Sequence, residues 1–103
     1  MMYGTVARLR IKKGMENEWL AFGKELEDSS PPGSIFDIVY RSDADPQVYF
    51  LAVVFESKEA YVANANSPEQ HAQYVRYRAF LEEEPEWHDG EVMSISRSAM
   101  QSS

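Results

Sequence analysis

Apolar and polar residues follow two different periods along this chain, and the period identifies each element. Residues 3–11 and 34–42 alternate, which predicts strands that are covered on one face and open on the other. The run Val48–Phe55 is apolar at every position, which is typical of a strand buried on both faces. A weaker alternation predicts a last strand over 90–97, entered through a turn at Trp87–Gly90.

Two segments show the spacing of helices. One apolar stripe recurs at steps of four, three and four, which predicts an amphipathic helix; its members are Met15, Trp19, Phe22 and Leu26. The prolines at 31 and 32 stop this helix. A second helical region begins after the cap residue Ser57, breaks near 64–68, and starts again at Ser67 to run through Leu81.

The resulting order of elements is β-α-β-β-α-β. It predicts a ferredoxin-like α+β domain, in which both helical segments lie on one face of a four-stranded antiparallel sheet. We expect a single domain over residues 1–98, followed by a flexible C-terminal tail at 99–103.

The helices leave the other face of the predicted sheet uncovered. We expect the central strand to contribute to this face Tyr49 or Phe50 together with Leu51, Val53 and Phe55. Such a face is too apolar to remain in water. A second copy of the chain is the simplest partner, so we expect a homodimer formed through the sheet face.

Composition excludes several classes of function. The chain has 103 residues and a formal charge of −7, which repels phosphate backbones and argues against nucleic acid as a partner. It has no cysteine, so disulfides, thiolate catalysis and cysteine-ligated zinc are excluded, and no histidine–carboxylate spacing suggests a metal. No apolar run approaches the roughly 20 residues that cross a bilayer, and no signal peptide is visible. We therefore expect a cytoplasmic protein without membrane association.

Three segments resemble the antibiotic biosynthesis monooxygenase family of dimeric α+β barrel proteins: Arg8–Gly14, Phe55–Tyr61 and Ser67–Glu69. The most specific of them is the pattern aromatic-Glu-Ser-x-x-Ala-Tyr at Phe55–Tyr61. The resemblance implies a homodimer whose two sheets pack face to face, with a pocket in each subunit between sheet and helices. The family includes cofactor-free oxygenases that form quinones, haem-degrading enzymes, and members with no established reaction.

The resemblance carries over to site residues only in part. Members that oxidise polycyclic phenols place an Asn, a Trp, a Tyr and an Arg around the substrate. Tyr61 matches that Tyr and Arg78 that Arg, whereas Leu51 stands at the Asn position and Phe55 at the Trp position. Haem-degrading members need an Asn on the first strand, where this chain has Ala7. The resemblance therefore disfavours haem chemistry, and we expect no cofactor.

Three polar side chains, His71, Tyr74 and Arg78, share one face of the second helical region and predict a small-molecule site. A cofactor-free oxygenase must deprotonate a phenol, which suits a histidine or a cation, and Arg78 would favour an anionic or phenolate ligand. We expect catalytic roles for His71, Arg78 and Tyr61, in a pocket lined by Trp19, Phe22, Tyr40 and Tyr74. The alternatives are an exposed His71, an ion pair between Arg78 and Glu82, and core positions for the aromatic residues.

Two functional hypotheses follow. The first is a cofactor-independent monooxygenase-like protein that acts on or binds a small aromatic or polyketide-type compound. The second is a non-catalytic homodimeric module of the same fold, which binds a small ligand or serves in a stress response. Tyr61 and Arg78 favour the first hypothesis, and Leu51 and Phe55 favour the second.

Overall fold

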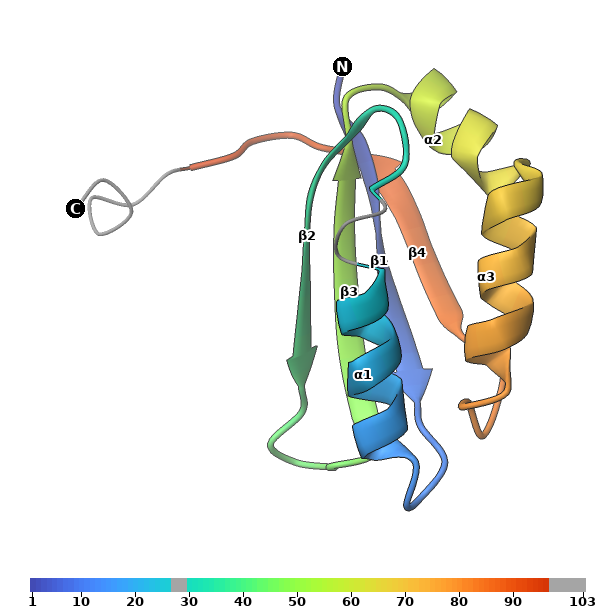
Figure 1. Ribbon diagram of the computed structural model, residues 1–103. Helices are drawn as coiled ribbons and strands as arrows, with labels where there is room; N and C mark the ends of the chain where they lie inside the picture. Colours follow the sequence, from blue (N-terminus) through green and yellow to red (C-terminus); the bar gives the residue numbers. More distant parts are fainter. Residues whose placement is uncertain (27–29, 97–103) are drawn as a thin grey trace.

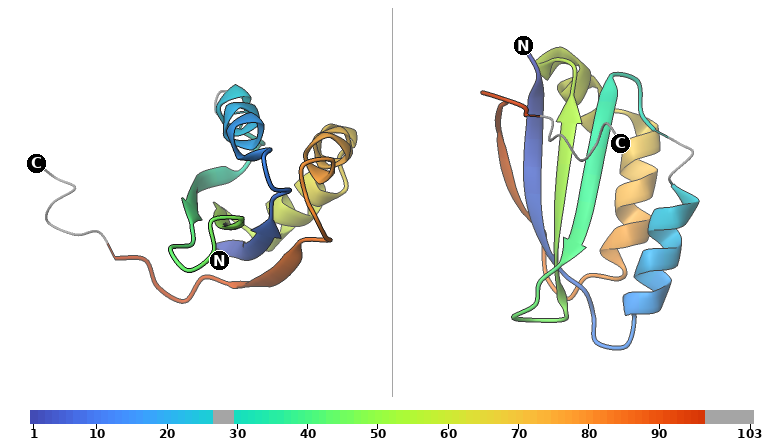
Figure 2. Two further views of the ribbon diagram at one scale, coloured as in Figure 1. Left: turned by 90° about the horizontal axis from the view of Figure 1, so that it is seen from below. Right: turned by 90° about the vertical axis from the view of Figure 1, so that its left-hand side faces the viewer.

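The chain forms one sheet whose helices all lie on the same face, as Figures 1 and 2 show for the computed structural model, which describes residues 1–26 and 30–96. The elements in chain order are β1 (Tyr3–Arg10), α1 (Glu16–Glu25), β2 (Ser34–Arg41), β3 (Val48–Phe55), α2 (Lys58–Ala65), α3 (Pro68–Arg78) and β4 (Glu86–Glu91). This is the predicted ferredoxin-like α+β fold, with the second helical region divided into α2 and α3. The tail predicted at 99–103 lies outside the described residues.

The four strands lie in the order β2-β3-β1-β4, and every neighbouring pair is antiparallel. The predicted hairpin of β2 and β3 is confirmed. The alternation predicted for β1 is also confirmed, because Ala7 and Leu9 are buried against the helices whereas Val6 is 45% exposed. We call the face that carries Val6 the outer face of the sheet.

The last strand lies earlier in the sequence than predicted. β4 is Glu86–Glu91, so Trp87–Gly90 belongs to the strand and is not a turn, while 92–96 lies outside it. All residues of β4 are exposed, as suits an edge strand. Pairing with β1, from Arg8 opposite Glu86 to Tyr3 opposite Glu91, sets the position of β4, and a polar edge strand carries no apolar alternation that would reveal it.

The prediction of which β3 side chains reach the outer face was wrong for most of them. Tyr49 lies opposite Leu9 and Leu51 lies opposite Ala7, so this row of β3, which also includes Val53 and Phe55, faces the helices. The outer row of β3 contains Phe50, Ala52 and Val54 instead. A continuous apolar run has no alternation of its own, so only the register against β1 decides which row faces outward.

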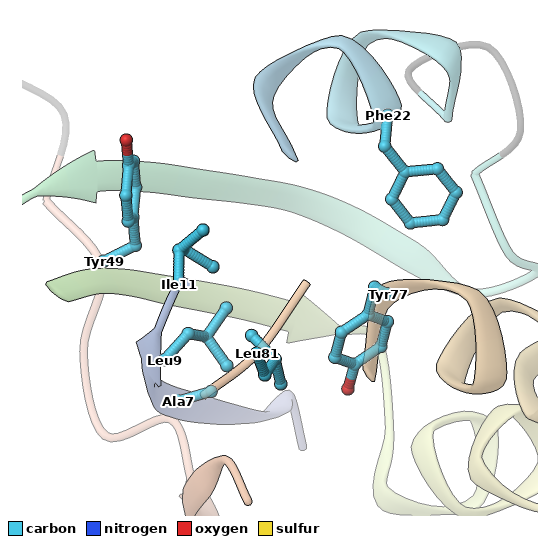
Figure 3. Close-up of a cluster of buried hydrophobic side chains, with 7 residues drawn as sticks. All are labelled: Ala7, Leu9, Ile11, Phe22, Tyr49, Tyr77 and Leu81. Atoms are coloured by element: carbon cyan, nitrogen blue, oxygen red, sulfur yellow. The ribbon is translucent and has the colours of Figure 1, made fainter. Parts of the chain in front are cut away.

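The core lies between the sheet and the helices. Figure 3 shows its buried members, which come from β1, β3, α1, α3 and an isolated bridge between residues 11 and 81: Ala7, Leu9, Ile11, Phe22, Tyr49, Tyr77 and Leu81. The predicted stripe of α1 is confirmed, since Met15, Trp19 and Leu26 pack against this cluster and Phe22 belongs to it. The ring of Trp19 makes edge contacts with Tyr49, Tyr77 and Phe80.

Two serines cap the starts of α2 and α3, and the second of them lies at the break between the two helices. The Ser57 hydroxyl accepts a hydrogen bond from the Ala60 amide at 3.1 Å, and the Ser67 hydroxyl accepts one from the Gln70 amide at 3.1 Å. Pro68 then occupies the first turn of α3, where its missing N–H is not needed. Both predicted helix starts are therefore confirmed, and α3 takes its own direction over the β1–β4 half of the sheet (Figure 2).

Candidate functional site

Three tyrosines from α2 and α3 gather on the helix-covered side of the sheet: Tyr61, Tyr74 and Tyr77, which we call the tyrosine cluster. Tyr61 is half-buried, Tyr77 is buried, and Tyr74 is half-buried. Two carboxylates hold the outer two hydroxyls, Asp89 on β4 and Glu84 in the segment before it. The cluster therefore combines aromatic surface with hydroxyl donors and negative charge, as small-molecule sites commonly do.

One end of the tyrosine cluster is an ordered pair between α2 and β4. The Tyr61 hydroxyl donates a hydrogen bond to the Asp89 carboxylate at 2.9 Å. Burial, and then this hydrogen bond, raise the pKa of Tyr61 to about 12. The ring is fixed by its neighbours, since its centroid lies 5.6 Å from that of Phe55 and 5.2 Å from that of Tyr3. Tyr61 therefore stays a neutral phenol that is oriented toward a carboxylate.

The other end of the tyrosine cluster is organised by Glu84. This carboxylate accepts hydrogen bonds from the Tyr74 hydroxyl at 2.7 Å and from the Arg78 Nε at 3.2 Å. The two bonds lower the pKa of Glu84, the Tyr74 bond being the larger cause, and the same contact raises the pKa of Tyr74. Arg78 also donates to the Leu81 carbonyl at 2.9 Å. An ion pair between Arg78 and Glu82 was the alternative to a catalytic role. Arg78 does form an ion pair, but its partner is Glu84.

Tyr77 lies between the two ends and has no counterpart in the sequence prediction. Its ring centroid is 5.3 Å from that of Tyr74 and 6.2 Å from that of Trp19. Its hydroxyl is buried and makes no hydrogen bond within the described part of the chain. Burial is the main cause that raises the pKa of Tyr77, with smaller effects from Tyr74, Glu84 and Tyr61. A buried donor without an acceptor is uncommon in folded proteins.

The structure brings together three of the predicted site residues, Tyr61, Tyr74 and Arg78, around Tyr77. Trp19 and Phe22 belong to the core, which was the alternative to a role in lining the pocket.

The remaining two predicted residues lie elsewhere. The His71 side chain is exposed on α3. Tyr40 was predicted to line the pocket on the helix side, but its ring stacks on Phe50 at 5.4 Å on the outer face. The sequence prediction missed Asp89 because it assigned that residue to a turn. It also missed Tyr77, although Tyr77 follows Tyr74 by three residues and therefore lies on the same face of the helix.

The charge of the cluster also differs from the prediction that Arg78 would favour an anionic ligand. Arg78 is paired with Glu84, so its charge is balanced, and Asp89 adds a negative charge that the cluster does not balance. An uncharged phenol therefore suits this cluster better than an anion.

Other features of the described residues bear on what the site could hold. Within residues 1–26 and 30–96, no group of three or more His, Asp or Glu side chains is placed to hold a metal. None of the helices in that part of the chain is long and apolar enough to cross a membrane. Two open hollows lie away from the tyrosine cluster, one of about 210 Å³ between α1 and β2 and one of about 410 Å³ along α2.

The fold defines a class, the small ferredoxin-like α+β domains whose helices all lie on one face of an antiparallel sheet. The sequence model of the antibiotic biosynthesis monooxygenase family matches residues 2–77, so the chain belongs to that family. No curated protein matches this sequence significantly.

Solved structures share the fold at low sequence identity. A protein from Chloroflexus aurantiacus J-10-fl, provisionally assigned as an antibiotic biosynthesis monooxygenase, is 23% identical, with a TM-score of 0.78 over 94% of this chain and 98% of that one. The N63A mutant of SnoaB, a cofactor-independent oxygenase from Streptomyces nogalater, is 14% identical, with a TM-score of 0.78 over 91% and 95%. A conserved protein from Methanosarcina mazei Go1 is 17% identical, with a TM-score of 0.77 over 88% and 92%.

Proposed function

We propose that this protein is a monooxygenase-type enzyme that oxidises a small aromatic compound, such as a polyketide-derived phenol, without a bound cofactor. Membership of the antibiotic biosynthesis monooxygenase family supports the reaction class. The observation that carries the proposal is the hydrogen bond of 2.9 Å from the Tyr61 hydroxyl to the Asp89 carboxylate, in a cluster that also contains the buried, unpaired hydroxyl of Tyr77. We assign the substrate to the tyrosine cluster.

The first chemical step in this proposal is loss of a proton from the substrate phenol. The phenol donates a hydrogen bond to the Tyr61 oxygen, and Tyr61 already donates its own proton to Asp89. A proton can therefore pass from the substrate to Tyr61 while the proton of Tyr61 passes to Asp89. Because the pKa of Tyr61 is raised to about 12, the tyrosine ends this relay as a neutral phenol, and the exposed Asp89 releases the proton to solvent before the next turnover.

The second step is reaction of the electron-rich phenolate with dioxygen. In a phenol with a hydrogen on the ring carbon para to the hydroxyl, that carbon of the phenolate attacks dioxygen, and the peroxide takes up one proton, which balances the proton lost in the first step, to give a hydroperoxide. Loss of water, which carries away the hydrogen of the same carbon, then leaves a carbonyl, so one oxygen atom enters the product and the other leaves as water. The hydroxyl of Tyr77 supplies a hydrogen bond to a substrate oxygen, and a donor already fixed by the fold needs little reorganisation.

His71 and Arg78 take different places in this proposal from those expected. The exposed His71 side chain makes no hydrogen bond or ion pair within the described residues, so Asp89 replaces it as the proton acceptor. Arg78 holds Glu84, which in turn holds the Tyr74 hydroxyl, so Arg78 acts as a positioning residue for one wall of the site.

Oxygen uptake with a panel of hydroquinones and anthrones tests the proposal. We expect uptake with at least one phenol of the panel, and we expect Asp89→Asn and Tyr61→Phe to reduce the rate by about 100-fold, the usual contribution of a general base. Asp43→Asn is the matched control, because it removes an exposed carboxylate from the β2–β3 loop. Saturable binding of these compounds without oxygen uptake would reject the enzyme and identify a ligand-binding module instead.

We further propose that two copies of the chain pair through the outer face of the sheet. This face exposes Val6, Phe36, Ile38 and Tyr40, which are 44–57% accessible to solvent, and it also carries the half-buried Phe50. The outer row of β2 contains no charge, although the chain as a whole carries −7. An apolar surface of this kind can pair with itself about a two-fold axis, with Arg8 of β1 standing in the same outer face opposite Phe50.

A further inference from the structure

A second candidate site lies at the opposite edge of the sheet from the tyrosine cluster. It is the hollow of about 210 Å³ between α1 and β2, lined by Leu20, Val39, Tyr40, Arg41 and Tyr49. β2 and β4 are the two edges of the sheet, so this hollow shares no residue with the tyrosine cluster. We call it the α1–β2 hollow.

The walls of the α1–β2 hollow are apolar. Leu20 on α1 is 45% exposed and Val39 on β2 is 48% exposed, although both are aliphatic side chains that gain free energy when covered. Val39 lies opposite Leu51, so it is on the helix side of the sheet and faces the same space as Leu20. These two residues thus offer a surface for an apolar group.

An arginine and a tyrosine from neighbouring strands both line the hollow. Arg41 and Tyr49 are direct partners across β2 and β3, so their side chains stand on the same face of the sheet. Arg41 forms no ion pair with any of the described residues, whereas Arg10, Arg76 and Arg78 do. The hollow therefore contains one arginine whose charge is available to a ligand.

The hydroxyl of Tyr49 is independent evidence for a ligand in the α1–β2 hollow. Its side chain is 2% exposed, and its hydroxyl is buried without a hydrogen-bond partner in the described chain. Figure 3 shows this hydroxyl pointing away from Leu9 and Leu81 of the core. An unpaired buried donor destabilises the fold unless something accepts its hydrogen bond, and a ligand oxygen that enters the hollow would do so.

We propose that the α1–β2 hollow binds a small carboxylic acid that carries a single apolar ring, of the benzoate or phenylacetate type. The volume suits one ring, since a cavity of about 150 Å³ accommodates benzene. The ring contacts Leu20 and Val39, and the carboxylate meets the Arg41 guanidinium and the Tyr49 hydroxyl. Planar, charge-assisted contacts of this kind are the ones that arginine makes best.

Titration with benzoate tests this site. Trp19 reports on it, because its ring centroid lies 6.2 Å from that of Tyr49, and Trp87→Phe removes the other tryptophan signal. We expect saturable fluorescence changes with benzoate and with phenylacetate, but not with benzyl alcohol or benzylamine at the same concentrations. Amide chemical shifts in an NMR titration should change at residues 20, 39 and 41 and not at the tyrosine cluster.

Two variants separate recognition from folding. Arg41→Met keeps the apolar stem and should weaken benzoate binding about tenfold, whereas Lys13→Met, in an exposed turn, should leave it within about twofold. Tyr49→Phe should weaken binding about fivefold without lowering the thermal midpoint of the free protein, since it removes an unpaired buried hydroxyl. Equal binding of benzoate and benzyl alcohol, unchanged affinity in both site variants, or chemical shifts confined to the tyrosine cluster would each overturn the proposal.

Discussion

The hydrogen bond between Tyr61 and Asp89 gives the sharpest test, because it is both a structural link from α2 to β4 and the centre of the proposed chemistry. A hydroxyl–carboxylate bond contributes about 1.5–3 kcal/mol when its surroundings exclude water. Here Asp89 is exposed and Tyr61 is only half-buried, so solvent screening reduces the expected coupling free energy to about 1 kcal/mol. That value changes the unfolding equilibrium constant about fivefold.

A double-mutant cycle measures this coupling. Tyr61→Phe, Asp89→Ala and the double variant are unfolded in urea at neutral pH, and the change in the free energy of unfolding of the double variant is compared with the sum of the single changes. The phenylalanine ring keeps the contacts with Phe55 and Tyr3, so the cycle isolates the hydroxyl. A coupling below about 0.3 kcal/mol, which is the usual error of additivity, would refute the hydrogen bond as a stabilising link.

The pH dependence checks the same pair from another direction. The pKa of Tyr61 is about 12 in the folded chain and 10.0 in the absence of its surroundings. A raised folded pKa means that the stabilisation is complete below pH 10 and is lost as the pH rises from 10 toward 12. The native protein should therefore lose more stability than Tyr61→Phe over this range, when both are compared by urea unfolding. If both proteins lose the same free energy of unfolding over this pH range, the folded structure does not raise the pKa of Tyr61.

Three further predictions concern the core, a cap and the outer face. Phe22→Ala removes a ring that is 5% exposed and packs 5.7 Å from Phe80, so it should lower the free energy of unfolding by about 3–5 kcal/mol; a loss below about 1 kcal/mol in urea unfolding would contradict its core position. Ser67→Ala should cost about 1 kcal/mol through loss of the α3 cap, whereas Ser67→Asp should restore it; equal stability of the three forms would argue against the cap. Ile38→Asp places a charge on the outer face and should convert the proposed dimer to a monomer in light scattering, with unchanged far-UV circular dichroism; a dimer that survives this charge would place the interface elsewhere.

The element types could be predicted because each is encoded by neighbours in the sequence. The stripe of α1 follows the helical period through Trp19 and Phe22, and the caps at Ser57 and Ser67 act within three residues of their own positions. Alternation in β1 likewise depends only on successive side chains pointing to opposite faces. The ferredoxin-like order followed from these local patterns together with the handedness of crossover connections.

Only the tertiary structure decided which row of β2 and of β3 faces the helices and which polar groups meet. Because Leu9 pairs with Tyr49, the row of β3 that contains Tyr49 faces the helices. Because Phe50 pairs with Tyr40, Tyr40 lies on the outer face and does not line the predicted pocket. The hydrogen bond between Tyr61 and Asp89 joins residues 28 positions apart, and it depends on β4 pairing with β1. Sequence periods specify local geometry, whereas register and contacts between distant elements arise from the packing of the whole chain.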